Sequence, residues 1–307
     1  MISKSYIEAI KSGDIVAFPT ETVYGLGADA WNPSAIQKVF STKGRPSDNP
    51  LIVHISEIEQ VHDFASEIPA SASRLMEAFW PGPLTLVLKK VPTVLDVVTA
   101  GLNTVAIRMP NHSIALEFIS KTGPLVAPSA NTSGKPSPTK AKHVLLDFGP
   151  DFPVIDGGAT SIGLESTVLD LTSEIATILR PGAIGKSEIE DVLKQEVQFS
   201  TKAPESPKSP GQKYSHYKPN AEVRWLDQTK ITETKKTLFL LQNMELETPN
   251  AIKYHGDLAK MAREVYDRFR QADIDGYEFI NIEPLDSFSN HPMYSALMNR
   301  IAKAVGV

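Results

Sequence analysis

Short apolar runs alternate with amphipathic stretches along the first two-thirds of the chain. The apolar runs are rich in valine, isoleucine and leucine and are bounded by glycine, proline or polar residues, which is typical of β-strands. They lie at 15–20, 51–55, 84–90, 104–110, 125–130, 166–172 and 176–182. Helical periodicity marks the segments 5–14, 34–42, 56–66, 69–79, 112–122, 139–147 and 186–195. Strands that alternate with helices predict an α/β sheet domain.

The spacing of the last two apolar runs predicts a mixed sheet. Only the tripeptide Ser-Glu-Ile separates 166–172 from 176–182. A connection this short can join antiparallel strands, but it cannot contain the crossover that parallel neighbours require. We therefore expect a sheet that contains both parallel and antiparallel strand pairs.

The composition changes abruptly at 200–220, where prolines and small polar residues replace the periodic pattern and predict an extended linker. Beyond it, 237–243 and 277–284 have the pattern of strands, and 257–272 has that of an amphipathic helix. The apolar stripe of this helix consists of Leu258, Met261, Ala262, Val265, Tyr266 and Phe269. The expected organisation is an α/β domain at 1–199, a Pro-rich linker or flap at 200–221 and a small α/β domain at 222–307.

The composition limits the functional classes to which the protein can belong. The chain has 307 residues, of which 41% are hydrophobic and 22% are charged, as in ordinary soluble globular proteins. Its net charge of -5 provides no overall attraction to nucleic acid or acidic membranes, so any anion must be bound locally. The absence of cysteine excludes disulfides, thiolate catalysis and zinc–cysteine sites. No apolar run has the length of a signal peptide or a membrane span, and we expect a cytoplasmic protein without a membrane partner.

Polar or cationic residues stand where several predicted strands end. The first strand is followed by Thr20, Glu21 and Thr22, and later strands deliver Arg108, Ser129, Asn131 and Arg180. In open α/β sheets, ligands bind in the crevice beyond the strand ends. Each residue could instead occupy an isolated turn, but the repetition favours one shared polar pocket.

The stretch KGRPSDNP places Lys43 and Arg45 on either side of a glycine, just before a strand. Arginine offers phosphate oxygens a planar fork and lysine offers a mobile point charge, so the pair suits a polyphosphate. The alternative is a solvated turn with two surface cations. His54 alternates with Ile52 in the next strand, so it is either a core histidine or a residue of the same crevice.

Several well-known motifs are matched only in part, or lack the neighbouring residues and elements that they require. Gly25, Gly27 and Ala30 satisfy a relaxed dinucleotide pattern, but the next helix is expected only at Pro33, so glycines that let the chain turn near a ligand are favoured. The segment 133–139 lacks the upstream glycine of a phosphate-binding loop. No metalloprotease or serine-hydrolase motif occurs, and Glu165 beside Ser166 is a single carboxylate without an acid–base partner.

The linker contains a basic and aromatic stretch, SPGQKYSHYKP, in which no acidic residue occurs between Lys208 and Asn220. Three interpretations remain open: a solvated tether, a flap that closes over a phosphorylated ligand, and a strand that contacts RNA.

Eight blocks between about residue 5 and residue 220 closely resemble the L-threonylcarbamoyladenylate synthase family, in its long form. They are PTETVYGLGADA, KGRPSDNPLIVHI, FWPGPLTLVL, VAIRMPNH, PLVAPSANTSGKPSPT, GLESTVLDL, ILRPGAI and SPGQKYSHYKP. The last 85 or so residues resemble the family's second domain only in size, position and α/β pattern. The resemblance implies a YrdC-like twisted mixed sheet with helices and a smaller, Rossmann-like α/β C-terminal domain.

The resemblance also implies an activity: nucleotidyl transfer that converts L-threonine, bicarbonate and ATP into threonylcarbamoyl-AMP, pyrophosphate and water. The product feeds the threonylcarbamoyladenosine modification of tRNA through a separate transferase complex. The implied threonine pocket consists of Thr22, His54, Arg108 and Ser166. The implied ATP side consists of Lys43, Arg45, Asn49, Thr104, Ser129, Asn131, Ser137, Arg180 and one of Tyr214 and Tyr217.

This chemistry agrees with the residues present. A carbamate of threonine attacks the α-phosphorus without a protein nucleophile, so catalysis would come from positioning and charge neutralisation. Lys43, Arg45 and Arg180, together with Mg²⁺ carried by ATP and no dedicated metal site, would offset the charge of the departing pyrophosphate. Because carbamates are labile in water, we expect 205–219 to close over the pocket.

Two alternative functions are considered. The first is an RNA-binding module in which nucleotide binding is incidental, and a weak contact with tRNA is possible. The second is an adenylate-forming enzyme that acts on another amino acid.

Overall fold

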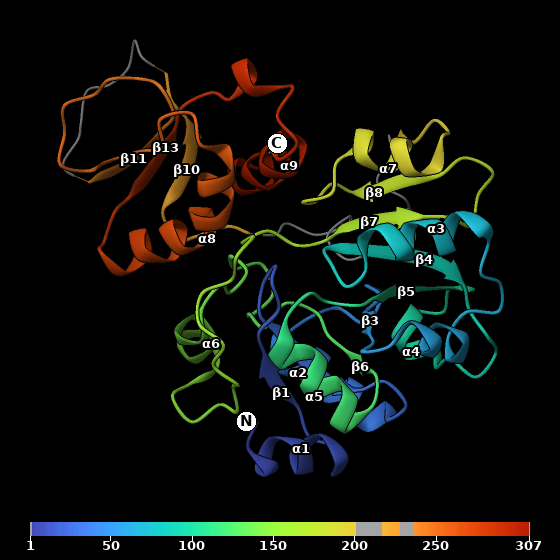
Figure 1. The fold of residues 1–307 in the computed structure, drawn as a ribbon. Coiled ribbons are helices and arrows are strands. Elements are labelled where there is room, and N and C mark those ends of the chain that lie inside the picture. The colour runs from blue at the N-terminus through green and yellow to red at the C-terminus, as the bar shows by residue number, and fades with distance from the viewer. Residues whose placement is uncertain (1, 201–216, 228–235, 307) are drawn as a thin grey trace.

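The computed structural model describes residues 2–200, 217–227 and 236–306. These residues form two α/β units, each built around its own sheet (Figure 1). The larger unit has a nine-stranded sheet in the order β1-β2-β6-β3-β5-β4-β7-β8-β9. Its strands are β1 (Val16–Phe18), β2 (Gly25–Asp29), β3 (Ile52–His54), β4 (Leu84–Lys89), β5 (Thr104–Arg108), β6 (Leu125–Val126), β7 (Thr167–Asp170), β8 (Thr177–Arg180) and β9 (Gln198–Phe199).

The larger sheet is mixed, as the sequence predicts. The parallel pairs are β3 with β5, β4 with β7, and β8 with β9, whereas the remaining pairs are antiparallel. The predicted hairpin is confirmed as the antiparallel pair β7–β8. It contains a register shift between Val168 and Leu169, the kind of irregularity that re-aims a side chain.

Helices cover both faces of this sheet. They are α1 (Lys4–Lys11), α2 (Pro33–Lys43), α3 (Ala70–Phe79), α4 (Asp96–Thr99), α5 (Ser113–Thr122), α6 (Ala141–Phe148) and α7 (Lys186–Leu193), with the 3₁₀ turn η1 (Ile58–Asp63). Alternate residues of β1 face different cores: Ala17 belongs to the core that contains α2 and α3, whereas Val16 and Phe18 belong to the core that contains residues of α1 and α5. Because β1 and most of β4 are buried on both faces, their sequences are mostly apolar rather than alternating.

Two local predictions about the larger unit need correction. The glycine-rich segment was expected to turn, but residues 25–29 form strand β2. The glycines are required by packing, because a Cβ on Gly27 would lie only 3.0 Å from the Phe18 ring. The segment 56–66 was expected to be a helix, but it contains only the 3₁₀ turn η1.

The expectation that a helix begins at Pro33 is confirmed. The side chain of Asn32 caps α2 by accepting from the backbone N–H groups of Ser34 and Ala35. The helix ends at Lys43, because Gly44 adopts a left-handed φ of 60° that a residue with a side chain tolerates poorly. This turn carries the chain directly to Arg45.

The smaller unit has four parallel strands in the order β10-β13-β11-β12. Its elements are β10 (Glu222–Trp225), β11 (Thr237–Leu241), β12 (Ala251–Lys253), α8 (Leu258–Ile274), β13 (Phe279–Ile282), η3 (Asp286–Phe288) and α9 (Tyr294–Val305). The predicted strands correspond to β11 and β13, the predicted helix corresponds to α8, and the whole predicted stripe of α8 is buried. The sequence analysis missed β10, β12 and α9.

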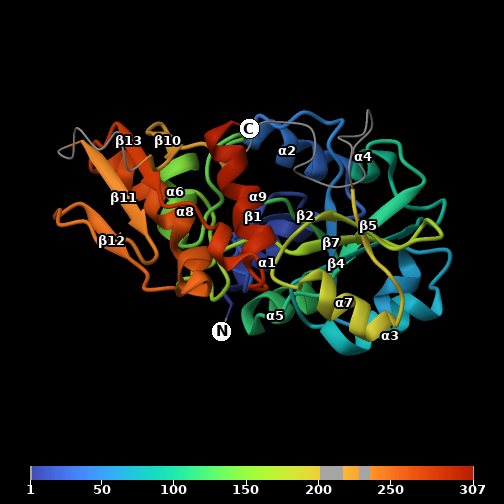
Figure 2. The same cartoon turned by 90° about the horizontal axis from the view of Figure 1, so that it is seen from above.

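The two units share a core. Val23 and Leu164 of the larger unit pack among the buried residues of α8 and α9. Helix α8 lies beside α6, and α9 lies between the second sheet and the larger unit (Figures 1 and 2). Lys140 and His143 of α6 pair with Asp267 of α8, and Arg270 pairs with Asp147. Among the described helices, none combines the length and the apolar character needed to cross a lipid bilayer.

Candidate active site

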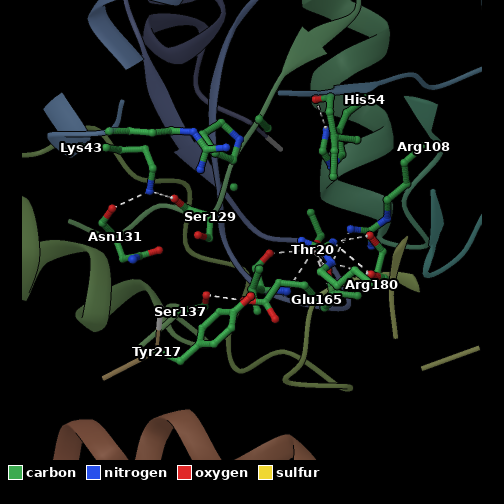
Figure 3. Close-up of a pocket in the computed structure, with 18 of the residues that line it drawn as sticks. Thr20, Lys43, His54, Arg108, Ser129, Asn131, Ser137, Glu165, Arg180 and Tyr217 are labelled. Carbon is green, nitrogen blue, oxygen red and sulfur yellow. Dashed lines mark hydrogen bonds between the residues drawn. The ribbon is translucent and has the colours of Figure 1, made fainter. Parts of the chain in front are cut away.

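One cavity lies on the face of the larger sheet that is opposite the core containing α2 and α3. Val53 and Ile107 point into that core, so their neighbours His54 and Arg108 point the other way. The cavity encloses about 700 Å³ of empty space, part of it open to solvent. All four predicted cations line it, and the other predicted residues on its walls are Thr20, Thr22, His54, Ser129, Asn131, Ser137, Ser166 and Tyr217 (Figure 3).

Two predicted residues that the structure describes do not join them. Thr104 begins β5 and lines a different cavity beside Lys89 and Lys90, at the far end of the strand from Arg108. Asn49 is buried, and its carbonyl oxygen accepts from Arg45 rather than facing the cavity. Tyr214 lies outside the described residues, as does most of the predicted flap at 205–219.

Lys43 enters the cavity from the last turn of α2. Its Nζ donates to the carbonyl oxygens of Ser129 and Asn131 at 2.5 and 2.6 Å. Burial, reinforced by the positive charge of Arg45, holds the pKa of Lys43 well below its ordinary value. Among the described residues, no carboxylate lies within hydrogen-bond reach of this Nζ, so an anionic ligand in the cavity would favour the charged form of Lys43.

Arg45 is fixed by the turn that follows α2. Its Nη2 donates to the carbonyl oxygens of Asn49 at 3.2 Å and Pro50 at 3.0 Å. These carbonyl oxygens orient the guanidinium through its N–H groups. Lys43 and Arg45 therefore place two basic side chains in the same part of the cavity, close enough for their charges to interact.

His54 is a neutral hydrogen-bonding group. Its Nδ1 lies 3.1 Å from the carbonyl oxygen of Ile52, which can only accept, so Nδ1 carries the proton and Nε2 is left as an acceptor. Burial and the neighbouring Arg108 lower the pKa of His54 to about 3. The parallel register sets His54 directly beside Arg108.

Arg108 is held at the end of β5 by three groups. Its Nε donates to the carbonyl oxygen of Gly82 at 3.3 Å, and Nη1 donates to Oγ1 of Thr22 at 2.9 Å. Its Nη2 lies 2.7 Å from Oε2 of Glu21 in a buried ion pair. A guanidinium fixed in this way can present its remaining N–H groups to a carboxylate.

Arg180 lies next to Ser166 on the same side of the cavity as Arg108 (Figure 3). Its Nε and Nη2 donate to the Ser166 carbonyl oxygen at 3.1 and 3.0 Å, and Nη2 also donates to Oγ at 3.1 Å. Ser166 Oγ is 2.8 Å from Oγ1 of Thr85. The β7–β8 pairing thus couples a predicted phosphate contact to a predicted amino-acid contact.

Glu165 is the wall residue whose role the sequence analysis missed. Ser137 Oγ donates to its Oε1 at 2.5 Å, while Tyr266 and Arg300 of the smaller unit donate to its Oε2 at 3.1 and 2.8 Å. Burial by itself would raise the pKa of Glu165, but the charges of Arg300 and Arg180 lower it to about 2. No local sequence signal identifies this role, because both of these donors lie more than 100 residues away.

Tyr217 is the linker tyrosine that the structure describes, and it lines the cavity. It adopts a left-handed φ of 71°, which is rare for a residue with a side chain. Its ring stacks on Tyr266 with centroids 5.3 Å apart, and Cζ of Arg300 lies 5.3 Å from its centroid. The smaller unit therefore holds this tyrosine at the wall of the cavity.

The described residues include no group of three histidine, aspartate or glutamate side chains that could hold a metal ion. The carboxylate of Glu165 is the acidic group on the cavity wall, and its oxygens are occupied by Ser137, Tyr266 and Arg300. This donor set does not fit a protein-held Mg²⁺, which takes several oxygen ligands in an octahedral arrangement.

Comparison with known families agrees with this architecture. Residues 8–182 match the Sua5/YciO/YrdC family, described as "Telomere recombination". Residues 184–306 match the family described as "Threonylcarbamoyl-AMP synthase, C-terminal domain". The fold therefore defines a two-part YrdC-like protein, and basic side chains line its cavity.

Comparison with individual relatives specifies the family to which the chain belongs. The chain is 44% identical to the threonylcarbamoyl-AMP synthase of Pyrococcus abyssi (strain GE5 / Orsay), across 97% of this chain and 92% of that protein. It is also 44% identical to the threonylcarbamoyl-AMP synthase of Bacillus subtilis (strain 168), across 97% of this chain and 91% of that protein. The crystal structure of P. abyssi Sua5 complexed with L-threonine matches with a TM-score of 0.89 at 42% identity, covering 98% of this chain and 93% of that one. The chain belongs to the threonylcarbamoyl-AMP synthase family.

Proposed function

We propose that this chain is a threonylcarbamoyl-AMP synthase, which converts L-threonine, bicarbonate and ATP into threonylcarbamoyl-AMP, pyrophosphate and water. The observation that carries the proposal is the gathering of Lys43, Arg45, Arg108 and Arg180 in one cavity of a chain with a net charge of -5. Glu21 pairs with Arg108 and the charge of Glu165 acts on Arg180, but four basic side chains gathered in one buried cavity still favour anionic ligands. A triphosphate together with an amino acid and bicarbonate supplies them.

The two ends of the cavity suit the two parts of the reaction. At one end, Arg108 and the neutral His54 would bind the carboxylate and the amine or hydroxyl of threonine, with Thr22 and Ser166 as further contacts. At the other end, Lys43 and Arg45 would bind the phosphates, with Ser129, Asn131, Ser137 and Tyr217 along the nucleotide. Arg180 lies beside Ser166, where it would face the junction between the two substrates.

The chemistry needs no protein nucleophile. The amine of threonine attacks the carbon of bicarbonate, and loss of water leaves a carbamate. A carbamate oxygen then attacks the α-phosphorus of ATP, and the bond to the bridging oxygen breaks to release pyrophosphate. The protein would contribute alignment of the two substrates and fixed positive charge at the phosphates.

Magnesium would enter with the nucleotide. Since the described cavity wall has no free cluster of carboxylates, Mg²⁺ would be bound by phosphate oxygens and water. When bound, it neutralises phosphate charge. We propose no side chain as its ligand.

The product would serve a separate complex that transfers the threonylcarbamoyl group to tRNA in the cytoplasm. An RNA-binding module with incidental nucleotide binding is the weaker alternative, because the acidic chain lacks an overall attraction for polyanions. The domain boundaries at 199 and 221 and a flap that closes over ATP are parts of the same proposal.

The decisive experiment is incubation of the purified chain with ATP, bicarbonate and each amino acid in turn, with mass detection of carbamoyl-adenylates. We expect threonylcarbamoyl-AMP and an equal amount of pyrophosphate with threonine, and neither product without bicarbonate. A carbamoyl-adenylate of another amino acid would reassign the substrate. Absence of any adenylate, combined with RNA binding that weakens steeply with salt, would favour the alternative.

A further inference from the structure

Glu21 is a buried acidic residue that the proposed mechanism has not used. It follows β1 between Thr20 and Thr22, and it is absent from the cavity wall although both neighbours line it. Its side chain is 6% exposed, and that of its partner Arg108 is 5% exposed. Neither carboxylate oxygen of Glu21 has a hydrogen bond of good geometry to a described residue, so the ion pair at 2.7 Å is its main compensation.

Three hydrogen bonds hold the loop that carries Glu21 in place. The carbonyl oxygen of Glu21 accepts from the backbone N–H of Ile162 at 2.9 Å, and that of Thr22 accepts from Gly163 at 3.1 Å. Oγ1 of Thr20 closes the loop by donating to the carbonyl oxygen of Val23 at 2.7 Å. A buried side chain on a fixed loop can hold its partner in one orientation.

The described contacts of Arg108 leave some of its N–H groups available to a ligand. A guanidinium has five N–H donors. Gly82 uses the one on Nε, Thr22 uses one on Nη1, and Glu21 faces Nη2. One N–H on each terminal nitrogen remains, and two such donors can bind the two oxygens of a carboxylate.

We propose that Glu21 is a positioning residue for the amino-acid substrate: it holds the guanidinium of Arg108 from behind, so that the terminal N–H groups face the α-carboxylate. This inference rests on the proposed function, because it assigns Arg108 to the carboxylate of threonine. Glu21 itself touches no substrate. Its loss should therefore weaken threonine binding and leave the nucleotide end unaffected.

The test compares the steady-state kinetics of wild type, Glu21→Gln and Glu21→Ala. We expect Glu21→Ala to raise the KM for threonine about tenfold or more, with the KM for ATP changed less than twofold. Glu21→Gln should raise it by a smaller factor, because glutamine has nearly the same size and keeps an oxygen that can face Nη2. The control is Glu67→Gln, at an exposed glutamate paired with Lys89, which should leave both constants unchanged.

Calorimetric titration with threonine gives a readout that does not depend on turnover, and Glu21→Gln carries the test if the alanine variant fails to fold. An unchanged or lower threonine KM in both variants would overturn the inference. A parallel rise in the KM for ATP and threonine would also overturn it, since it would indicate general damage to the cavity. Failure of the wild type to form any carbamoyl-adenylate would instead contradict the proposed function.

Discussion

Nε of Arg300, in the last helix of the chain, lies 2.8 Å from Oε2 of Glu165 on the cavity wall. The arginine side chain is fully buried and the glutamate side chain is 8% exposed. Nη2 of Arg300 also donates to the carbonyl oxygen of Pro181, next to Arg180. The smaller unit thus supplies the counter-charge of a residue in the cavity of the larger unit.

Replacing Arg300 with methionine should destabilise the protein strongly. The substitution leaves Glu165 buried without its partner, and breaking a buried pair on one side costs about 3–5 kcal/mol. Urea denaturation measures the loss. The control is Arg268→Met, which removes a partly exposed pair with Glu264 and should cost no more than about 1 kcal/mol. The double variant Arg300→Met/Glu165→Gln should recover part of the loss, and equal losses in the single and double variants would contradict the assignment.

Gly163 should tolerate alanine less well than Gly158. Both have a left-handed backbone, with φ of 82° and 80°, so both pay about 1–2 kcal/mol for a side chain in that region. A Cβ on Gly163 would also lie 2.4–2.7 Å from the backbone of Arg263 in α8, whereas one on Gly158 meets nothing within 4 Å. We expect Gly163→Ala to cost roughly 1–3 kcal/mol more. Thermal denaturation measures the difference between the two variants. Equal decreases in their melting temperatures would show that α8 does not pack this closely against Gly163.

Arg45→Ala should lower ATP-dependent pyrophosphate release by about two orders of magnitude or more. This is the scale expected when a fixed charge is removed from the developing charge of a transition state. The matched control is Arg74→Ala on the exposed surface of α3, which should retain wild-type turnover. Near-wild-type release by the Arg45 variant would remove Arg45 from the phosphate site.

His54 should make the protein less stable as the pH falls. Its pKa is about 3 in the folded chain against an ordinary value of 6.5, so below pH 6.5 the unfolded chain binds a proton that the folded chain does not. Stability is therefore fully present above pH 6.5 and falls toward pH 3, with a slope of up to about 1.4 kcal/mol per pH unit.

The measurement is the free energy of unfolding of wild type and His54→Asn at several pH values from about 6 to about 5. The slope of the unfolding free energy against pH should be smaller in the variant by about 1.4 kcal/mol per pH unit, nearly the full contribution of one histidine. His112 and His143, whose pKa values are also lowered, contribute equally to both proteins and cancel in the difference. Parallel slopes would mean that His54 is protonated or exposed in the folded state.

Local sequence patterns sufficed where the physical cause is itself local. The start of α2 at Pro33 follows from the Asn32 cap, and the β7–β8 hairpin follows from its short connection. Strand β2 was missed because glycine reads as a turn, although here it makes room for Phe18. Thr104, assigned by resemblance, begins the strand whose other end reaches the cavity.

The sequence by itself predicted most of the strands and helices of the larger unit, the mixed character of its sheet and the presence of cations at several strand ends. Each of these depends on neighbours a few positions away. Tertiary structure alone decided which polar groups meet. Lys43 reaches the carbonyl of Ser129 across 86 positions, and Arg300 reaches Glu165 across 135. Such pairs leave no periodic trace in the chain, because they depend on how segments far apart in the sequence pack against one another.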